Sequence, residues 1–129
     1  MRVMIDTNVL ISAIYSPNSL PAQTVQSVGN EHTLVLSEYI LEECRAVFDR
    51  KFPHHLSAFE AMLVGFKLEI VPSAGASSVT LTDTKDQPIL NSAIASKVDI
   101  LVTGDKGFFG LDIKHPKVVT PAEFLKQMA

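Results

Sequence analysis

Two acidic side chains follow short apolar runs that predict buried strands. Asp6 comes directly after residues 3–5 (VMI), and Asp105 comes shortly after residues 100–102 in ILVTGDKG. In parallel sheets, ligands bind beyond the carboxyl ends of the strands, so both carboxylates are candidates for one site at that edge. Each acid also has a structural explanation when it is taken alone. Asp6 can cap the helix that follows, and Asp105 can be an ordinary turn residue.

A third acid lies on the helix predicted from Ser37, its N-cap, to about residue 50. At about 100° per residue the apolar side chains of this helix form one stripe, and Glu43 borders that stripe. Glu42 points nearly opposite, into solvent. Because a surface helix has little need of a carboxylate beside its buried face, Glu43 is the better site candidate. The alternative is a boundary residue that only reaches for water.

Two aspartates compete for a fourth position in LTDTKDQPIL. Asp86 lies in the first turn of the helix predicted over residues 86–97, whereas Asp83 lies in the loop before it. A metal ligand benefits from a rigid mount, so Asp86 is the predicted ligand and Asp83 a supporting or structural residue. The structural alternative for Asp86 is its favourable interaction with the helix dipole.

Four carboxylates that converge repel one another unless some bind protons or a divalent cation enters. Ligation by oxygen alone suits Mg²⁺ or Mn²⁺ better than Zn²⁺. Such ions can activate a water molecule and stabilise the leaving oxygen of a phosphodiester. The net charge of −3 argues against a generally basic nucleic-acid binder. Contacts through bound cations would nevertheless let an acidic protein hold a polyanion.

The elements that must position these acids alternate along the chain. Strands are predicted over residues 3–5, 33–36, 68–71, 100–102 and 117–119, with helical stretches between them. This alternation predicts one α/β domain over residues 1–129, with helices on both faces of a parallel sheet. No run has the length of a membrane span, and no secretory signal is recognisable, so we expect a cytoplasmic protein. Cys44, the only cysteine, excludes an internal disulfide.

Taken together, four motifs resemble the PIN (PilT N-terminus) domain. They are Asp6-Thr7-Asn8 after the first strand, Ser37 with Glu43 in SEYILEECRAVF, Asp86 in TKDQPILNSAIA and Asp105 in ILVTGDKGF. The likeness is strongest to the compact prokaryotic branch of toxins from toxin–antitoxin pairs, and it covers essentially the whole chain.

This resemblance implies a three-layer α/β/α sandwich with a five-stranded, mainly parallel sheet in the order 3-2-1-4-5. It implies a ribonuclease that uses Mg²⁺ or Mn²⁺ and cleaves RNA endonucleolytically, with single-stranded RNA as the expected substrate. A homodimer and an antitoxin partner are further family expectations. By position, the family's acidic quartet matches Asp6, Glu43, Asp86 and Asp105, and its supporting polar residues match Asn8, Ser37 and Thr103.

Two other functions compete with the nuclease. An aspartate-nucleophile phosphatase would use Asp6, but such enzymes usually carry a second aspartate two residues on, where this chain has Asn8. A PIN-like binding module would recruit partners without cutting, which the complete acidic set disfavours. Lys106 can contact phosphate, and Arg45 can line a substrate groove together with Arg50 and Lys51. A solvated lysine and an exposed helix face are the simpler interpretations.

Overall fold

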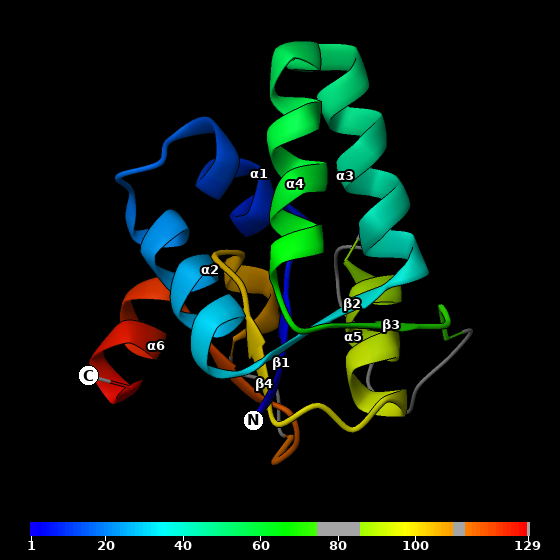
Figure 1. The fold of residues 1–129 in the computed structure, drawn as a ribbon. Coiled ribbons are helices and arrows are strands. Elements are labelled where there is room, and N and C mark those ends of the chain that lie inside the picture. The colour runs from blue at the N-terminus through cyan, green and yellow to red at the C-terminus, as the bar shows by residue number, and fades with distance from the viewer. Residues whose placement is uncertain (75–85, 110–112, 129) are drawn as a thin grey trace.

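Five parallel strands form one sheet in the order β3-β2-β1-β4-β5 (Figure 1). The computed structural model describes residues 1–74, 86–109 and 113–128. The predicted fold class and strand order are confirmed. The strands are β1 (Arg2–Ile5), β2 (Thr33–Ser37), β3 (Leu68–Val71), β4 (Ile100–Val102) and β5 (Lys117–Val119).

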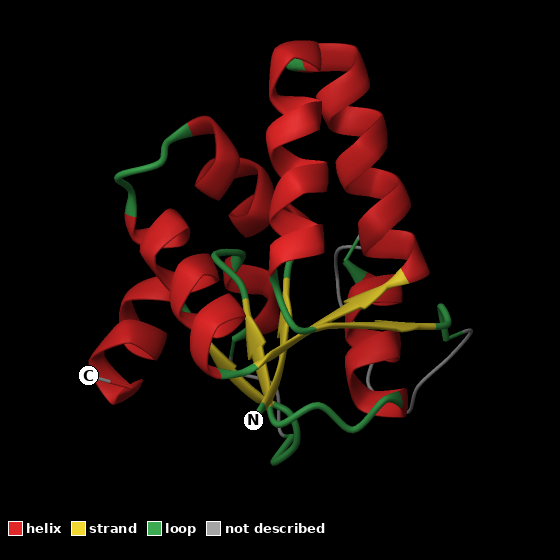
Figure 2. Ribbon diagram, in the orientation of Figure 1, coloured by secondary structure: helices red, strands yellow, loops and turns green. Residues whose placement is uncertain are grey.

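Helices cover the sheet from both sides, with α2 and α6 on one side and α5 on the other (Figure 2). The central strands are therefore apolar on both faces, as in β1, where Val3, Met4 and Ile5 are fully buried. In the described residues, no helix is both long and apolar enough to cross a membrane. The helices are α1 (Thr7–Tyr15), α2 (Leu20–Glu31), α3 (Glu38–Lys51), α4 (Leu56–Gly65), α5 (Gln87–Ala95) and α6 (Pro121–Met128).

Two predicted helical segments differ in detail from the structure. Residues 53–66, one of the helical stretches predicted between the strands, form a short 3₁₀ helix, η1 (Pro53–His55), followed by α4. Asp86 is the N-cap residue of α5 and does not lie in its first turn. Both differences arise near a proline, which fixes its own φ and restricts the residue before it. Asp83 lies outside the described residues, so its predicted role stays a prediction.

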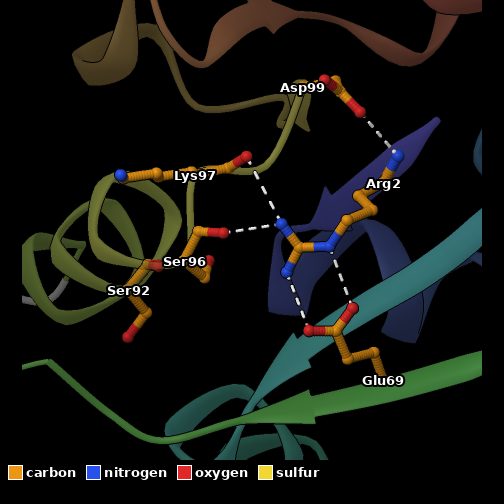
Figure 3. Close-up of polar contacts among 6 residues, drawn as sticks. All are labelled: Arg2, Glu69, Ser92, Ser96, Lys97 and Asp99. Atoms are coloured by element: carbon orange, nitrogen blue, oxygen red, sulfur yellow. Dashed lines mark hydrogen bonds and ion pairs between the residues drawn. The ribbon is translucent and has the colours of Figure 1, made fainter.

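Arg2 ties the amino end of β1 to two other elements (Figure 3). Its Nε and Nη2 donate to the two carboxylate oxygens of Glu69 on β3, at 2.9 and 2.8 Å, and this two-point geometry is strong for an ion pair. Its Nη1 donates to the carbonyl oxygens of Ser96 and Lys97, at 2.6 and 3.3 Å, and satisfies acceptors that the end of α5 leaves open. Arg2 therefore anchors α5 at the end opposite Asp86.

Gly29 in α2 packs directly against the ring of Phe66, which follows α4, so a β-carbon there would collide with that ring. We predict that Gly29→Ala lowers the free energy of unfolding by about 1–3 kcal/mol, although alanine favours helices. Gly65→Ala is the matched control, because a β-carbon at that helical position meets open space. It should be neutral or stabilising by up to about 1 kcal/mol. Urea unfolding measures both, and equal effects of the two changes would contradict the packing argument.

Candidate active site

Asp6 is buried where β1 ends, with only 2% of its surface exposed. Its backbone N–H donates to the carbonyl of Val102 at 2.9 Å, which extends the pairing of β1 with β4. By position Asp6 is the N-cap residue of α1, but its side chain makes no capping hydrogen bond. Its Oδ2 instead accepts a hydrogen bond from Thr103 Oγ1 at 2.8 Å. The carboxylate is thus held by Thr103, at the end of the neighbouring strand.

Thr103 connects two of the predicted acids. Besides donating to Asp6, its fully buried hydroxyl oxygen accepts a hydrogen bond from the backbone N–H of Asp105 at 3.1 Å. Asp105 Oδ1 in turn accepts from the N–H of Gly107 at 2.8 Å and caps the short 3₁₀ helix η2 (Lys106–Phe108). Consequently, one hydroxyl fixes the Asp6 side chain and the backbone that carries Asp105.

Glu43 is half-buried on α3 and Glu42 is exposed, as the helical pattern predicted. Tyr39, one turn earlier, donates its hydroxyl hydrogen to Glu43 Oε2 at 3.1 Å. Burial raises the pKa of Tyr39, and so do the charges of Glu43, Asp86 and Asp6. The hydroxyl therefore faces the acids. Sequence reasoning missed Tyr39, although its spacing of four residues from Glu43 was a usable signal.

Asp86 and Asp105 lie within hydrogen-bonding reach of each other. This hydrogen bond is the main cause that lowers the pKa of Asp105 below its ordinary value, and the N–H of Gly107 acts in the same direction. The carboxyl groups of Asp86 and Asp105 are therefore close enough to affect each other's ionisation.

The charges of the site act on Asp6 as well. Burial raises the pKa of Asp6 and the negative charges of Glu43 and Asp105 raise it further, while the hydroxyl of Thr103 and the backbone N–H of Asn8 oppose them. The pairwise interactions thus link Asp6 with Glu43 and Asp105, and Asp105 with Asp86. The structure brings the four acids predicted from the sequence into one neighbourhood.

The other predicted residues lie at or near this neighbourhood in different ways. Asn8 is exposed in the first turn of α1 and lines a hollow together with Asp105. Ser37 is the N-cap of α3, as predicted, and its buried Oγ accepts from the N–H of Ile40 at 3.1 Å. Arg45 pairs with Glu60 on α4 at 2.7 Å, and Lys106 is exposed.

The donor set fits a divalent cation chemically, because its four acids offer only oxygen ligands, as Mg²⁺ and Mn²⁺ prefer. The side chains are not arranged as a complete metal site, however. In the part of the chain that the structure describes, no group of three or more His, Cys, Asp or Glu side chains is placed to hold a metal ion. Carboxyl groups ligate a cation in their ionised form, so cation binding at these acids would depend on pH.

Comparison with known families decides the classification. The model of the PIN domain matches residues 2–107. The chain belongs to the PIN domain family. PIN domains are generally nucleases, and the strand order described above is the one that the family resemblance implied.

Two known proteins are similar to this PIN domain, one in sequence and one in structure. An uncharacterized protein of Methanocaldococcus jannaschii, MJ1680, is 29% identical, over 98% of this chain and 91% of the relative. Among solved structures, VapBC2 from Rickettsia felis, bound to a DNA fragment from their promoter, superimposes with a TM-score of 0.68. That likeness covers 92% of this chain and 97% of the other, and at 19% identity it shows the fold alone.

The raised pKa of Asp6 leads to a prediction about stability. Folding favours the protonated acid, so its contribution to stability is complete below the unfolded pKa, about 4, and is lost as the pH rises through the folded value. Asp6→Asn should therefore be more stable than the native chain at pH 7 in EDTA, and the difference should shrink as the pH falls towards 4. Thermal unfolding from pH 4 to 8 measures this.

Asp49→Asn, on the exposed side of α3, is the control and should show no such pH-dependent gain. A loss of stability in Asp6→Asn at pH 7, as large as its loss at pH 4, would contradict the electrostatic argument.

Proposed function

We propose that this protein is an endoribonuclease in which Asp6, Glu43, Asp86 and Asp105 hold Mg²⁺ or Mn²⁺ and single-stranded RNA is the substrate. The observation that carries the proposal is the position of Asp6 at the ends of β1 and β4, where burial, together with the charges of Glu43 and Asp105, raises its pKa. A fold seldom buries a carboxylate among like charges without a functional reason. Membership of a family of nucleases supports the same conclusion.

Each part of the site has a distinct task in this proposal. When bound, the cation supplies an activated water and stabilises the charge on the leaving oxygen. Thr103 fixes the Asp6 carboxylate and the backbone of Asp105, so these two ligands keep their separation. Tyr39 orients Glu43 through its hydroxyl. The cation charge also favours the ionised form of Asp6, which offsets the effect of burial.

Neighbouring glutamates on α3 provide a matched test of the catalytic set. Purified protein should cut single-stranded RNA when Mn²⁺ or Mg²⁺ is present and should be inactive in EDTA. Glu43→Gln and Asp6→Asn should each lower kcat/KM by about 100-fold or more, a loss typical of removing a group that stabilises charge in the transition state. Glu42→Gln, one residue away and exposed, should retain native activity. A gel assay with a labelled oligonucleotide measures all four proteins.

Activity that persists in EDTA would contradict the metal-dependent mechanism. Calorimetry supplies a second measurement, because Mn²⁺ binding favours the ionised form of Asp6, whose pKa is raised, and should therefore release protons. The measured heat should then vary with the ionisation enthalpy of the buffer.

The two tyrosines of the chain test the orientation of Glu43. Tyr39→Phe removes only the hydroxyl that donates to Glu43, so kcat should fall by about three- to tenfold, as expected for one lost hydrogen bond. Tyr15→Phe is the control and should match the native enzyme, because Tyr15 is exposed beside Phe52 at the end of α1. Single-turnover cleavage at saturating Mn²⁺ measures both, and equal kcat values for the two variants would remove Tyr39 from the mechanism.

A second candidate function is a binding module that recruits partners without cutting. It is favoured by the placement of the acids, because in the residues that the structure describes no group of three or more His, Cys, Asp or Glu side chains is placed to hold a metal ion. Calorimetry that detects no Mn²⁺ binding at millimolar concentration would select this function over the nuclease.

We also propose an antitoxin partner and a homodimer, as the resemblance to the toxin branch implies. The similarity in fold to VapBC2 supports the proposed antitoxin partner. The surface offers an apolar hollow of about 560 Å³ for such contacts, and Val64 on α4 is 88% exposed. The apolar residues that line this hollow are Ala13, Ile14, Pro17, Ala22, Val25 and Met62.

A further inference from the structure

A hollow of about 280 Å³ adjoins the acids on the side of α1. Asn8 and Ser12 line it from α1, Gly104 and Asp105 line it from the segment after β4, and two prolines from the starts of other helices complete it. Asp105 belongs to both the hollow and the acidic set. A strand of RNA that places a phosphate at the acids therefore passes directly beside this hollow.

The walls of the hollow are suited to a flat, uncharged group. Val9, Pro21 and Pro121 provide apolar surface. Asn8 and Ser12 are four residues apart, so they lie on the same face of α1, and each side chain can donate and accept a hydrogen bond. This combination, apolar walls with two adaptable polar groups, is the usual composition of a small-molecule site.

A phosphate is a poor occupant of the same hollow. None of the described residues that line it is a lysine or arginine, and Asp105 contributes a carboxylate. The volume lies just below the range of about 300–1,000 Å³ that is typical for pockets of drug-sized ligands, so the hollow suits one base and not a stacked pair. Its chemistry and its size both favour a nucleobase.

We propose that this hollow receives the nucleobase next to the phosphate that is cut, and that Ser12 is a specificity-determining residue. The proposal rests on the proposed ribonuclease function, because it takes RNA as the substrate. In this arrangement Pro21 and Pro121 contact the faces of the base, while Asn8 and Ser12 form hydrogen bonds with its polar edge. Bases differ in the donors and acceptors along that edge, so the site discriminates among them.

Binding of nucleosides tests the proposal without any cleavage step. The full chain, labelled with ¹⁵N, is titrated with adenosine, cytidine, guanosine and uridine, and the amide shifts are followed. We expect shifts at the amides of Asn8, Ser12 and Gly104, with one nucleoside binding more tightly than the others. Ser12→Ala, which keeps a good helix former at an exposed helical position, should lower the affinity for that nucleoside by about three- to tenfold. Ser57→Ala, at an exposed position on α4 outside the hollow, should bind like the native chain.

Cleavage of an RNA pool of random sequence separates this inference from the proposed function. Native protein should prefer one base beside the cut, and Ser12→Ala should flatten that preference three- to tenfold while it still cuts. Native cleavage with an identical base preference in Ser12→Ala would overturn the inference and leave the nuclease intact. Nucleoside shifts at the hollow without any cleavage would support the base site and count against the nuclease. No shift at these amides with any of the four nucleosides would overturn the inference.

Discussion

The hydroxyl of Thr103 is the contact on which the candidate site depends. It donates to the Asp6 carboxylate and accepts from the backbone of Asp105, so it joins the ends of two adjacent parallel strands. Because the hydroxyl is fully buried, water cannot substitute for either partner. The pairing of β1 with β4 brings Thr103 beside Asp6, and the central position of both strands keeps that pairing rigid. The sheet thus determines where two of the four acids lie.

The same rigidity imposes an electrostatic cost. Asp6 is held in a buried position near Glu43 and Asp105, where ionisation is unfavourable and its pKa is raised. Asp86 and Asp105 also lie close together, and the Asp86 side chain lowers the pKa of Asp105. A core built for stability alone would place apolar side chains here. In the proposed function, a ligand of opposite charge would offset this cost.

Contacts outside the site position the two helices that contribute acids to it. Arg2 holds the carboxyl end of α5 through backbone carbonyls and links it to Glu69 on β3, while Asp86 sits at the opposite end of that helix. Ser37 caps α3 and so fixes the start of the helix that carries Tyr39 and Glu43. Arg2 and Ser37 thus help to position the helices that carry the acids. We expect substitutions at these two residues to affect the site by shifting those helices.

The sequence by itself determined the alternation of strands and helices, the acids at the strand ends and the contrast between Glu42 and Glu43, because these follow from local patterns of apolar residues. The strand order came from likeness to a known family, since local patterns carry no information about which strands pair. Only the tertiary structure decided that Asp6 accepts a hydrogen bond from Thr103 and that its side chain makes no capping hydrogen bond to α1. It also decided that Tyr39 donates a hydrogen bond to Glu43, and that Ser12 and Pro121 line the same hollow. The physical reason is that the direction of a side chain depends on contacts with segments far away in the chain.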